Sequence, residues 1–491
     1  MAVDDQQLYQ VLRDRFGFSD FRDGQLETIH AILAGQNVLA VLPTGGGKSL
    51  LYQLPAYVIN RPVLIISPLL SLMQDQINRL RLVGEKRILQ LSGELQGRER
   101  KQALQQLGQY RFVFASPEIL VNSAVKKAIG MVEWGLMVVD EAHCISQWGP
   151  DFRPEYLLLA DIHHLLHRPP LLMVTATATP AVRHDILNKM DLRANSVHQV
   201  IRSVNRQNIF LVVEHFPNGQ DKMARLKELI LHLPLPGIVY FASRKMASQV
   251  AEWLSQQTGL VVAAYHAGIS PLERYRLQQQ FMTGKVQVIC ATSAFGMGID
   301  KSDIRFVIHY HLPANLESYV QEIGRAGRDE QPSVAILMYS PGDEEIQATL
   351  TRIDLPAANL IDQVRLRQLP VRALGDQAEL FKFYLDQGYQ GKQIVRSFQR
   401  RAHDSHQRLL KMLDYLNSDH CRRQVITDYF GEPFAKQAPC CDIDQPTWLT
   451  DHFWNTEINR GPSRQSSQLD WRAHLQQLLV PTANEQESAR Q

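Results

Sequence analysis

Short apolar runs recur along the first 340 residues, and most of them end in polar or glycine-rich stretches. In the first half these runs begin at Val38, Val63, Phe112, Leu136 and Leu171. Runs of four to six apolar residues that alternate with helical patterns are typical of buried strands in a parallel sheet. Because ligands bind at the carboxyl ends of such strands, the polar residues that follow them are expected to gather along one edge.

A second set of runs repeats this pattern and begins at Ile238, Val261, Val286, Phe306 and Val334. We therefore predict an α/β fold with two parallel-sheet domains in tandem, which meet near Arg202–Arg206. The predicted boundaries are 1–204 and 205–341 for these domains, 342–444 for a helical region, and 445–491 for a polar tail with one short amphipathic helix at 468–480.

The first run leads into a turn that suits phosphate binding, and its residues are Thr44, Gly45, Gly46, Gly47, Lys48 and Ser49. Consecutive glycines let backbone N–H groups converge on an anion, and the helix that follows adds its partial positive charge. Lys48 would reach the β- and γ-phosphates, and the Ser49 hydroxyl would bind Mg²⁺. Leu42 stands where this motif usually has its first glycine, so an ordinary glycine turn is the alternative.

An acidic pair follows the run that begins at Leu136. Asp140 stands where a carboxylate would hold Mg²⁺, and Glu141 stands where it could orient or deprotonate an attacking water. An acidic helix cap is the alternative.

Aromatic and polar residues precede the phosphate loop. Phe18 and Arg22 could sandwich a flat base, and the Gln25 amide could bond the edge of that base. A helix-capping turn with a core phenylalanine is the alternative.

The second domain carries two arginines, Arg325 and Arg328, three residues apart and shortly after Gln321. On a helix this spacing places both guanidinium groups on one face, from which they could reach a γ-phosphate across a cleft. A solvated basic helix is the alternative.

Composition limits the remaining choices. A formal net charge of +2 excludes a polycation, so a nucleic-acid surface must come from local clustering, as in the stretch 365–423 with its excess of Lys and Arg. The polar N-terminus excludes a secretory signal, and the apolar runs are too short to span a membrane. We expect a soluble, cytoplasmic protein with no membrane contact. An odd number of cysteines, five, argues against a disulfide framework.

Taken together, these motifs resemble the RecQ family of superfamily 2 DNA helicases. The resemblance runs from about residue 8 to about residue 441, in family order, and rests on the stretches 16–25, 42–49 (LPTGGGKS), 67–76 (SPLLSLMQDQ), 140–149 (DEAHCISQWG), 151–156 (DFRPEY), 175–179 (TATAT), 265–268 (YHAG), 291–301 (ATSAFGMGIDK) and 321–329 (QEIGRAGRD). It implies two RecA-like domains that hydrolyse ATP in the cleft between them, coupled to 3′-to-5′ movement on single-stranded DNA and to duplex unwinding.

The resemblance also implies a role for each motif residue. Adenine would lie against the stretch that holds Phe18, Arg22 and Gln25, the phosphates and Mg²⁺ would bind Lys48 and Ser49, and the metal would also bind Asp140. For the hydrolysis step it implies Glu141 for the water, Gln321 as a γ-phosphate sensor, and Arg328 as the arginine finger with Arg325 beside it.

The stretch 144–155 resembles the family's aromatic-rich loop, which links DNA contact to hydrolysis. Trp148 and Phe152 offer faces on which bases can stack, and Arg153 adds charge. Pro150 replaces a usual histidine and removes a side-chain donor, so coupling to DNA is expected to differ. Without the surrounding motifs, these aromatics could equally be core residues. Single-stranded and forked DNA are the expected partners.

The C-terminal end departs from the family. The residues Cys421, Cys440, Cys441 and Asp444 match its zinc-binding region, but two cysteines are adjacent and an aspartate replaces the last one. A degenerate site that folds without Zn²⁺ is equally compatible with the sequence. The residues after 444 are too few for a winged-helix domain or for the further helicase-and-RNase-D-like C-terminal domain. We expect a short form, in which the tail could bind repair or recombination proteins. A DNA-stimulated ATPase that acts as a translocase, clamp or annealing switch is the rival function, and an RNA helicase is a weaker third.

Overall fold

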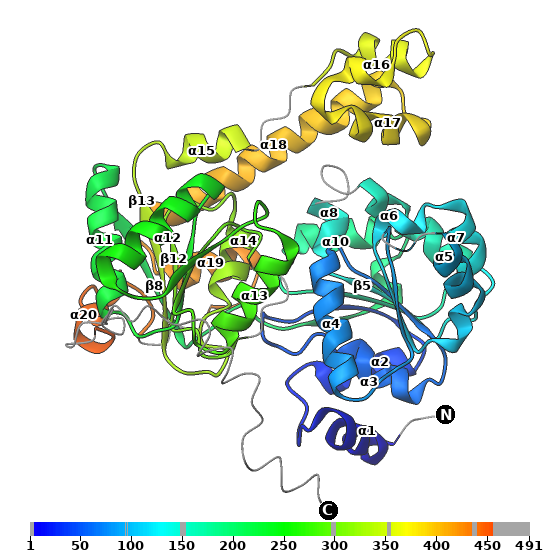
Figure 1. The fold of residues 1–491 in the computed structure, drawn as a ribbon, viewed down its shortest axis with the longest axis horizontal. Coiled ribbons are helices and arrows are strands. Elements are labelled where there is room, and N and C mark those ends of the chain that lie inside the picture. Colours follow the sequence, from blue (N-terminus) through cyan, green and yellow to red (C-terminus); the bar gives the residue numbers. More distant parts are fainter. Residues whose placement is uncertain are drawn as a thin grey trace, which may run out of the picture.

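The structure is a computed structural model that describes residues 4–93, 95, 97–147, 154–295, 301–350, 355–434 and 439–454. Two parallel sheets lie side by side, and helices cover both faces of each (Figure 1). This arrangement confirms the predicted fold class. The first sheet ends at Ile201 and the second begins at Ile209, so the segment 202–208 joins the two domains.

The first domain contains seven parallel strands in the order β3-β4-β2-β5-β6-β1-β7. The strands are β1 (Asn37–Val41), β2 (Val63–Ile66), β3 (Ile88–Leu91), β4 (Phe112–Ala115), β5 (Leu136–Asp140), β6 (Leu171–Thr175) and β7 (Val197–Ile201). The helices are α1 (Asp5–Val11), α2 (Gln25–Leu33), α3 (Leu50–Val58), α4 (Leu70–Leu82), α5 (Gly97–Gln105), α6 (Pro117–Leu120), α7 (Ser123–Ile129), α8 (His143–Gln147), α9 (Leu159–Leu165) and α10 (Pro180–Lys189).

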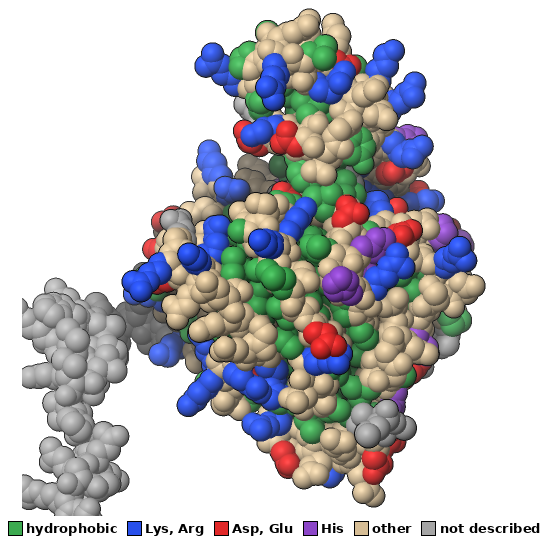
Figure 2. Space-filling model, turned by 90° about the vertical axis from the view of Figure 1, so that its right-hand side faces the viewer, with side chains coloured by type: hydrophobic (Ala, Val, Ile, Leu, Met, Phe, Trp, Pro, Cys, Tyr) green, Lys and Arg blue, Asp and Glu red, His purple; other side chains and the backbone are tan. Residues whose placement is uncertain are grey.

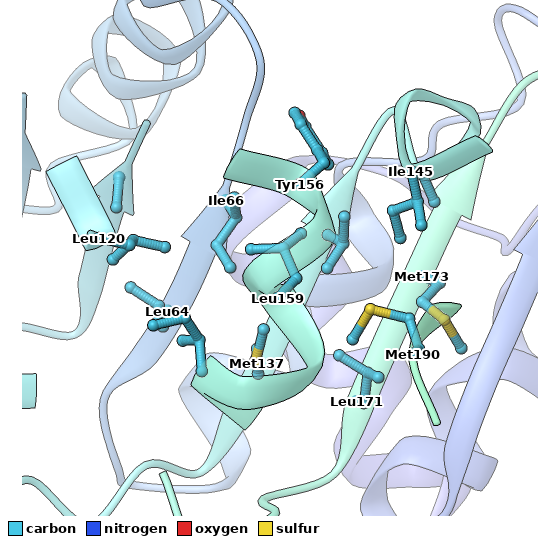
Figure 3. Close-up of a cluster of buried hydrophobic side chains, with 14 of the residues drawn as sticks. Leu64, Ile66, Leu120, Met137, Ile145, Tyr156, Leu159, Leu171, Met173 and Met190 are labelled. Atoms are coloured by element: carbon cyan, nitrogen blue, oxygen red, sulfur yellow. The ribbon is translucent and has the colours of Figure 1, made fainter. Parts of the chain in front are cut away.

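Parallel strands are buried on both faces, which explains their nearly continuous apolar sequences. One core of this domain lies under α8, α9 and α10, where Leu159 and Met190 meet Met137 and Met173 of the sheet (Figure 3). Because Asp140 ends β5 and Thr175 ends the neighbouring β6, side chains from different motifs reach the same edge.

The second domain contains six parallel strands in the order β10-β11-β9-β12-β13-β8. The strands are β8 (Ile209–His215), β9 (Gly237–Tyr240), β10 (Val262–Tyr265), β11 (Val288–Ala291), β12 (Phe306–His309) and β13 (Ser333–Tyr339). The helices are α11 (Gly219–His232), α12 (Arg244–Thr258), α13 (Pro271–Met282) and α14 (Leu316–Ile323).

A helical region follows, with α15 (Asp343–Leu350), α16 (Ala358–Arg365), α17 (Ala378–Asp386), α18 (Gly391–Leu416) and α19 (Arg422–Phe430). The 26-residue helix α18 is about 39 Å long at 1.5 Å per residue. Its C-terminal end packs into the core of the second domain through Met412 and Tyr415. Its other end carries α16 and α17 as a separate helical lobe (Figure 1).

The last described segment packs on the second domain. Helix α20 (Trp448–His452) places Trp448 against Phe210 of β8, with ring centroids 4.2 Å apart and planes 23° apart. Leu449 and Phe453 are buried in the same core. Residues 445–454, which the sequence assigns to a polar tail, therefore complete the second domain, and the predicted helix at 468–480 lies outside the described residues.

Candidate nucleotide site between the two sheets

A cavity of about 380 Å³ lies where the two domains face each other. Among its lining residues are all predicted nucleotide-site residues except Gly46, namely Phe18, Arg22, Gln25, Thr44, Gly45, Gly47, Lys48, Ser49, Asp140, Glu141, Gln321, Arg325 and Arg328. Gly46 lies in the same turn. The structure thus brings together residues that are up to 310 positions apart, from 18 to 328.

The phosphate loop joins β1 to α3. Gly45 and Gly47 have φ angles of +87° and +72°, a region that favours glycine. An added Cβ at Gly47 would lie 2.3 Å from Gln25 Nε2, so this position also needs glycine for space.

Gln25 holds this loop in place. Its side chain is almost fully buried, and its Nε2 donates to the carbonyl oxygens of Gly46 at 3.0 Å and Gly47 at 3.2 Å. Its Oε1 accepts from the backbone N–H of Arg22 at 2.9 Å, and the Arg22 guanidinium donates to the carbonyl of Gly45. In this conformation the Gln25 amide is used by the loop, and its expected bond to adenine stays a prediction. Phe18 is 54% exposed and lines the cavity.

Lys48 and two carboxylates form the charged centre of the cavity. Burial lowers the pKa of Lys48, while the charges of Glu141 and Asp140 act in the opposite direction. Burial, followed by the neighbouring Glu141 carboxylate, raises the pKa of Asp140 to about 7. Two carboxyl groups side by side favour a bound cation, and carboxylate and hydroxyl oxygens are suitable Mg²⁺ ligands, so Asp140 and Ser49 fit that ion.

Glu141 has a left-handed backbone conformation and a buried carboxylate oxygen that lacks a hydrogen bond. It has a φ of 51°, a left-handed conformation that costs a non-glycine residue about 1–2 kcal/mol. Its Oε2 is buried and has no hydrogen-bond partner, although it lies 3.3 Å from His143 Nδ1. A buried carboxylate oxygen without a partner is costly unless something binds to it, and a water molecule would satisfy it.

His143 connects this acidic motif to the end of β6. The Thr175 hydroxyl donates to the carbonyl of Thr177 at 3.2 Å, so it accepts a hydrogen bond from His143 Nδ1 at 2.9 Å. Burial lowers the pKa of His143 and so favours the neutral ring, in which the proton would lie on Nδ1 for this bond. Neither His143 nor Thr175 was assigned a site role from the sequence, although the two stretches that contain them were singled out.

The second domain reaches the phosphate loop directly. An added Cβ at Gly45 would lie 3.3 Å from Arg328 Cγ, and one at Gly324 would lie 3.2 Å from the Thr44 side chain. Gln321 and Arg325 line the same cavity, and Arg325 is buried. The predicted arginine pair therefore lies against the phosphate loop.

The two domains also meet through individual polar contacts. Gln278 of α13 donates to Asp75 of α4 at 3.0 Å. Arg206, in the segment between the sheets, donates to the carbonyl of Thr44 at 3.1 Å and to that of Gly324 at 3.3 Å. The sequence marked Arg206 only as a domain boundary, and no motif there pointed to a role in the site.

A second candidate site lies where α19 meets the chain after 438. Ligand atoms of Cys421, Cys440, Cys441 and Asp444 all lie within 4.8 Å of one another. Cys441 Sγ is 3.8 Å from Cys421 Sγ and 3.5 Å from Asp444 Oδ2, while the sulfurs of Cys421 and Cys440 are 3.2 Å apart. Tetrahedral Zn²⁺ with bonds of about 2.3 Å places neighbouring sulfurs about 3.8 Å apart. The Cys421–Cys441 pair has this spacing and the Cys421–Cys440 pair is closer, and three thiols with one carboxylate are a donor set that suits the ion. Adjacency of the two cysteines does not prevent both from joining one cluster.

Hydrogen bonds around the cluster also suit a metal-bound thiolate. Arg423 Nε donates to Cys440 Sγ at 3.2 Å, and the backbone N–H of Arg422 donates to Cys441 Sγ at 3.4 Å. The pKa of the Cys441 thiol is lowered to about 6, first by a hydrogen bond from Cys440. Such outer contacts orient metal ligands and stabilise their charged form.

Three protein-family models match segments of this chain. The DEAD/DEAH box helicase family matches residues 22–186, the helicase conserved C-terminal domain matches 221–330, and the RecQ zinc-binding family matches 378–445. The chain is 40% identical over 453 residues to the probable ATP-dependent DNA helicase RecS of Bacillus subtilis, across 88% of this chain and 91% of that protein. It belongs to the RecQ family of ATP-dependent DNA helicases.

Other RecQ relatives differ in length. The chain is 38% identical over 436 residues to the ATP-dependent DNA helicase RecQ of Haemophilus influenzae, across 88% of this chain and 62% of that protein. It is 34% identical to the ATP-dependent DNA helicase RecQ of Synechocystis sp., across 98% of that protein.

Solved structures agree in fold. The Mycobacterium smegmatis helicase Lhr, bound to ssDNA and AMP-PNP, has a TM-score of 0.57 at 22% identity over 75% of this chain and 55% of its own. The S. cerevisiae Dbp5, bound to RNA and ADP BeF3, has a TM-score of 0.57 at 19% identity over 71% of this chain and 92% of its own. At such identities the likeness shows the fold alone. In the described part of the chain, helices that combine the length and apolarity needed to cross a membrane are absent.

The RecQ-like aromatic loop cannot be placed, because Trp148, Pro150, Phe152 and Arg153 lie outside the described residues. Ser146, which precedes these residues in the chain, lines a groove of about 860 Å³. Its other wall belongs to the helical region, and it is aromatic and basic, with Tyr384, Tyr389, Arg400, Arg401 and Arg408. Several Lys and Arg side chains also project from the helical lobe at the top of Figure 2, among hydrophobic and other side chains.

Proposed function

We propose that this RecQ helicase hydrolyses ATP between its two sheets and uses the cycle to move 3′-to-5′ on single-stranded DNA and open duplexes during recombination and repair. The observation that carries the proposal is the single cavity in which the phosphate loop, the acidic pair and the two arginines meet. Single-stranded and forked DNA would be the partners. Action on DNA would place the protein in the cytoplasm.

In this mechanism the first domain binds the nucleotide. The ring of Phe18 and the guanidinium of Arg22 receive adenine, and the backbone of 44–49 with Lys48 surrounds the phosphates. Ser49 and Asp140 would hold Mg²⁺, which when bound neutralises charge on the phosphate oxygens. Adenine would replace the contacts that Arg22 and Gln25 now make with loop carbonyls, and the Gln25 amide would bond the edge of the base.

Hydrolysis then needs groups from both domains. Glu141, whose Oε2 is buried without a hydrogen bond, orients the attacking water and accepts its proton. Arg328 stabilises the charge that develops on the transferred phosphoryl group, Arg325 lies beside it, and Gln321 contacts the γ-phosphate. Because Arg328 comes from the other domain, the rate depends on how closely the two sheets approach.

DNA would run past the groove that Ser146 lines. Stacking of bases on tyrosines is worth about 1–3 kcal/mol per base, and arginines supply the phosphate contacts. The tail after 454 could recruit repair or recombination proteins.

Zn²⁺ would be structural. Cys421, Cys440, Cys441 and Asp444 would supply four protein ligands, the number that a closed structural Zn²⁺ site requires, so the ion would have no place for a reacting water. Elemental analysis of the purified protein is expected to give about one zinc per chain. A ratio near zero in folded, active protein would remove Zn²⁺ from the account.

ATP turnover tests the proposed mechanism. Hydrolysis is measured with and without single-stranded DNA for the wild type, Lys48→Ala and Glu141→Gln. Both variants are expected to lose at least about 100-fold in kcat. Glu133→Gln, which removes a surface carboxylate paired with Arg61 at 2.9 Å, is the control and should hydrolyse normally. Near-normal turnover in Lys48→Ala or Glu141→Gln would overturn the role given to that residue.

A further inference from the structure

Arg206 connects the two halves of the nucleotide site. It follows β7 by a few residues and is half-buried between the sheets. Its guanidinium donates to the carbonyl of Thr44 in the phosphate loop and to the carbonyls of Gly324 and Gly327 at the end of α14. One side chain from the connecting segment therefore bonds to both domains at once.

The carbonyls that Arg206 contacts in the second domain flank the arginine pair. Gly324 directly precedes Arg325, and Gly327 directly precedes Arg328. Asn208, also in the connecting segment, donates to the Gly327 carbonyl at 2.8 Å, and its Oδ1 accepts from Arg206 at 3.4 Å. The turn that presents Arg328 is thus fixed by side chains that lie outside both sheets.

The RecQ zinc-binding region holds the backbone of the same segment from its other side. Arg423 donates to the carbonyls of Arg206 at 2.8 Å and Ile209 at 2.7 Å, while its Nε contacts Cys440 of the candidate zinc cluster. Glu432 accepts from the backbone N–H of Val204 at 3.0 Å. These contacts fix the segment on either side of Arg206.

We propose that Arg206 is a positioning residue for ATP hydrolysis: it sets the distance between the phosphate loop and the Arg328 turn, and the zinc-binding region fixes Arg206 through Arg423 and Glu432. The proposal rests on the proposed function, because it assumes that Arg328 acts on the γ-phosphate. It assigns the zinc-binding region a part in the catalytic cycle that differs from DNA contact.

Arginine suits this position for a chemical reason. Its planar guanidinium carries five donors in a fixed fork and remains charged at all relevant pH values. Arg206 can therefore donate to carbonyl oxygens that lie in three directions. The single ammonium of a lysine would make these bonds with poorer geometry. Misplacing a reacting group by about 1 Å can cost about 100-fold in rate, so a small change in this distance is enough to affect kcat.

The test separates positioning from binding and from folding. Arg206→Ala and Arg206→Lys are compared with Arg225→Ala, a control that removes an arginine bonded to Glu214 at 2.7 Å inside the second domain. We expect Arg206→Ala to lose about 10- to 100-fold in kcat, with Arg206→Lys between it and the wild type. The Kd of a fluorescent ATP analogue should change less than about threefold, because the groups that contact nucleotide are unchanged. A kcat within twofold of wild type in both variants would overturn the proposal.

A double-mutant cycle decides whether Arg206 acts through Arg328. In an Arg328→Ala background, Arg206→Ala should cost less than about threefold in kcat, since the group it positions is gone. An undiminished loss in that background would show a separate structural role and overturn the proposal. If Arg328→Ala alone hydrolyses normally, the arginine-finger assignment of the proposed function fails, and that result is distinct from a failure at Arg206.

Discussion

Gly47→Ala tests the geometry of the phosphate loop at its tightest point. The glycine has a φ of +72°, and an added Cβ would lie 2.3 Å from Gln25 Nε2 and 3.6 Å from its Cδ. Gln25 would have to move, and its Nε2 would lose the bonds to Gly46 and Gly47 while its Oε1 would lose the Arg22 N–H.

The size of the effect follows from these contacts. A left-handed conformation costs alanine about 1–2 kcal/mol relative to glycine. Three lost hydrogen bonds at about 0.5–1.5 kcal/mol each add about 3 kcal/mol. We expect a total of about 4–5 kcal/mol in the free energy of unfolding. One kcal/mol shifts Tm by about 2–4 °C in a unit of 150–250 residues, so Tm should fall by at least about 8 °C.

Thermal unfolding of the first domain measures this loss of stability, and Gly84→Ala is the matched control. Gly84 has a φ of +84° and no atom within 4 Å of an added Cβ, so its substitution carries only the conformational cost. The expected shift for Gly84→Ala is about 2–8 °C. Gly47→Ala should also weaken ATP binding, because the loop can no longer close around phosphates. Equal shifts for the two variants would refute the placement of Gln25 against the loop.

Three further predictions follow from the site. Arg328→Ala should lower kcat by about 1,000-fold or more while the nucleotide Kd changes little, as stopped-flow and steady-state assays would show, and unchanged turnover would contradict its role. Because the pKa of Asp140 is raised to about 7, its carboxyl is increasingly protonated below that pH and protons compete with Mg²⁺. The Mg²⁺ concentration for half-maximal hydrolysis should therefore rise as pH falls from 8 to 6, and a flat profile would refute this. Cys441→Ser should release zinc and lower Tm, measured by elemental analysis and calorimetry, whereas retained zinc would exclude this ligand.

The sequence predicted the interior strands of both sheets well and the edge strands poorly. The strands β3, β7 and β8 were not among the predicted runs, and each lies at an edge of its sheet. An edge strand has one neighbour and more solvent contact, so β3 and β7 carry polar residues such as Gln90, His198 and Gln199 that break the apolar run. The run Ile209–Val213 in β8 is continuously apolar, so the same pattern could have predicted β8, but the prediction left it out.

The gathering of the candidate nucleotide-site residues around one cavity could be predicted because their motifs are local. The phosphate loop, Asp140 and the Arg325–Arg328 pair each lie within a few residues of a strand or helix end, and parallel topology brings those ends together. Arg206 could not be assigned in this way, because its contacts are to backbone carbonyls of two distant segments and leave no pattern of their own. The packing of Trp448 on Phe210 is also a tertiary contact that composition does not reveal.

The most direct test of the central claim is strand separation on a fork with a 3′ single-stranded tail, with ATP consumption followed in parallel. The wild type is compared with Lys48→Ala and with a fork that carries a 5′ tail. We predict ATP-dependent separation of the 3′-tailed fork, its loss in Lys48→Ala, and much less separation of the 5′-tailed fork. DNA-stimulated hydrolysis without strand separation would contradict a helicase and would make the protein a translocase or an ATP-driven switch.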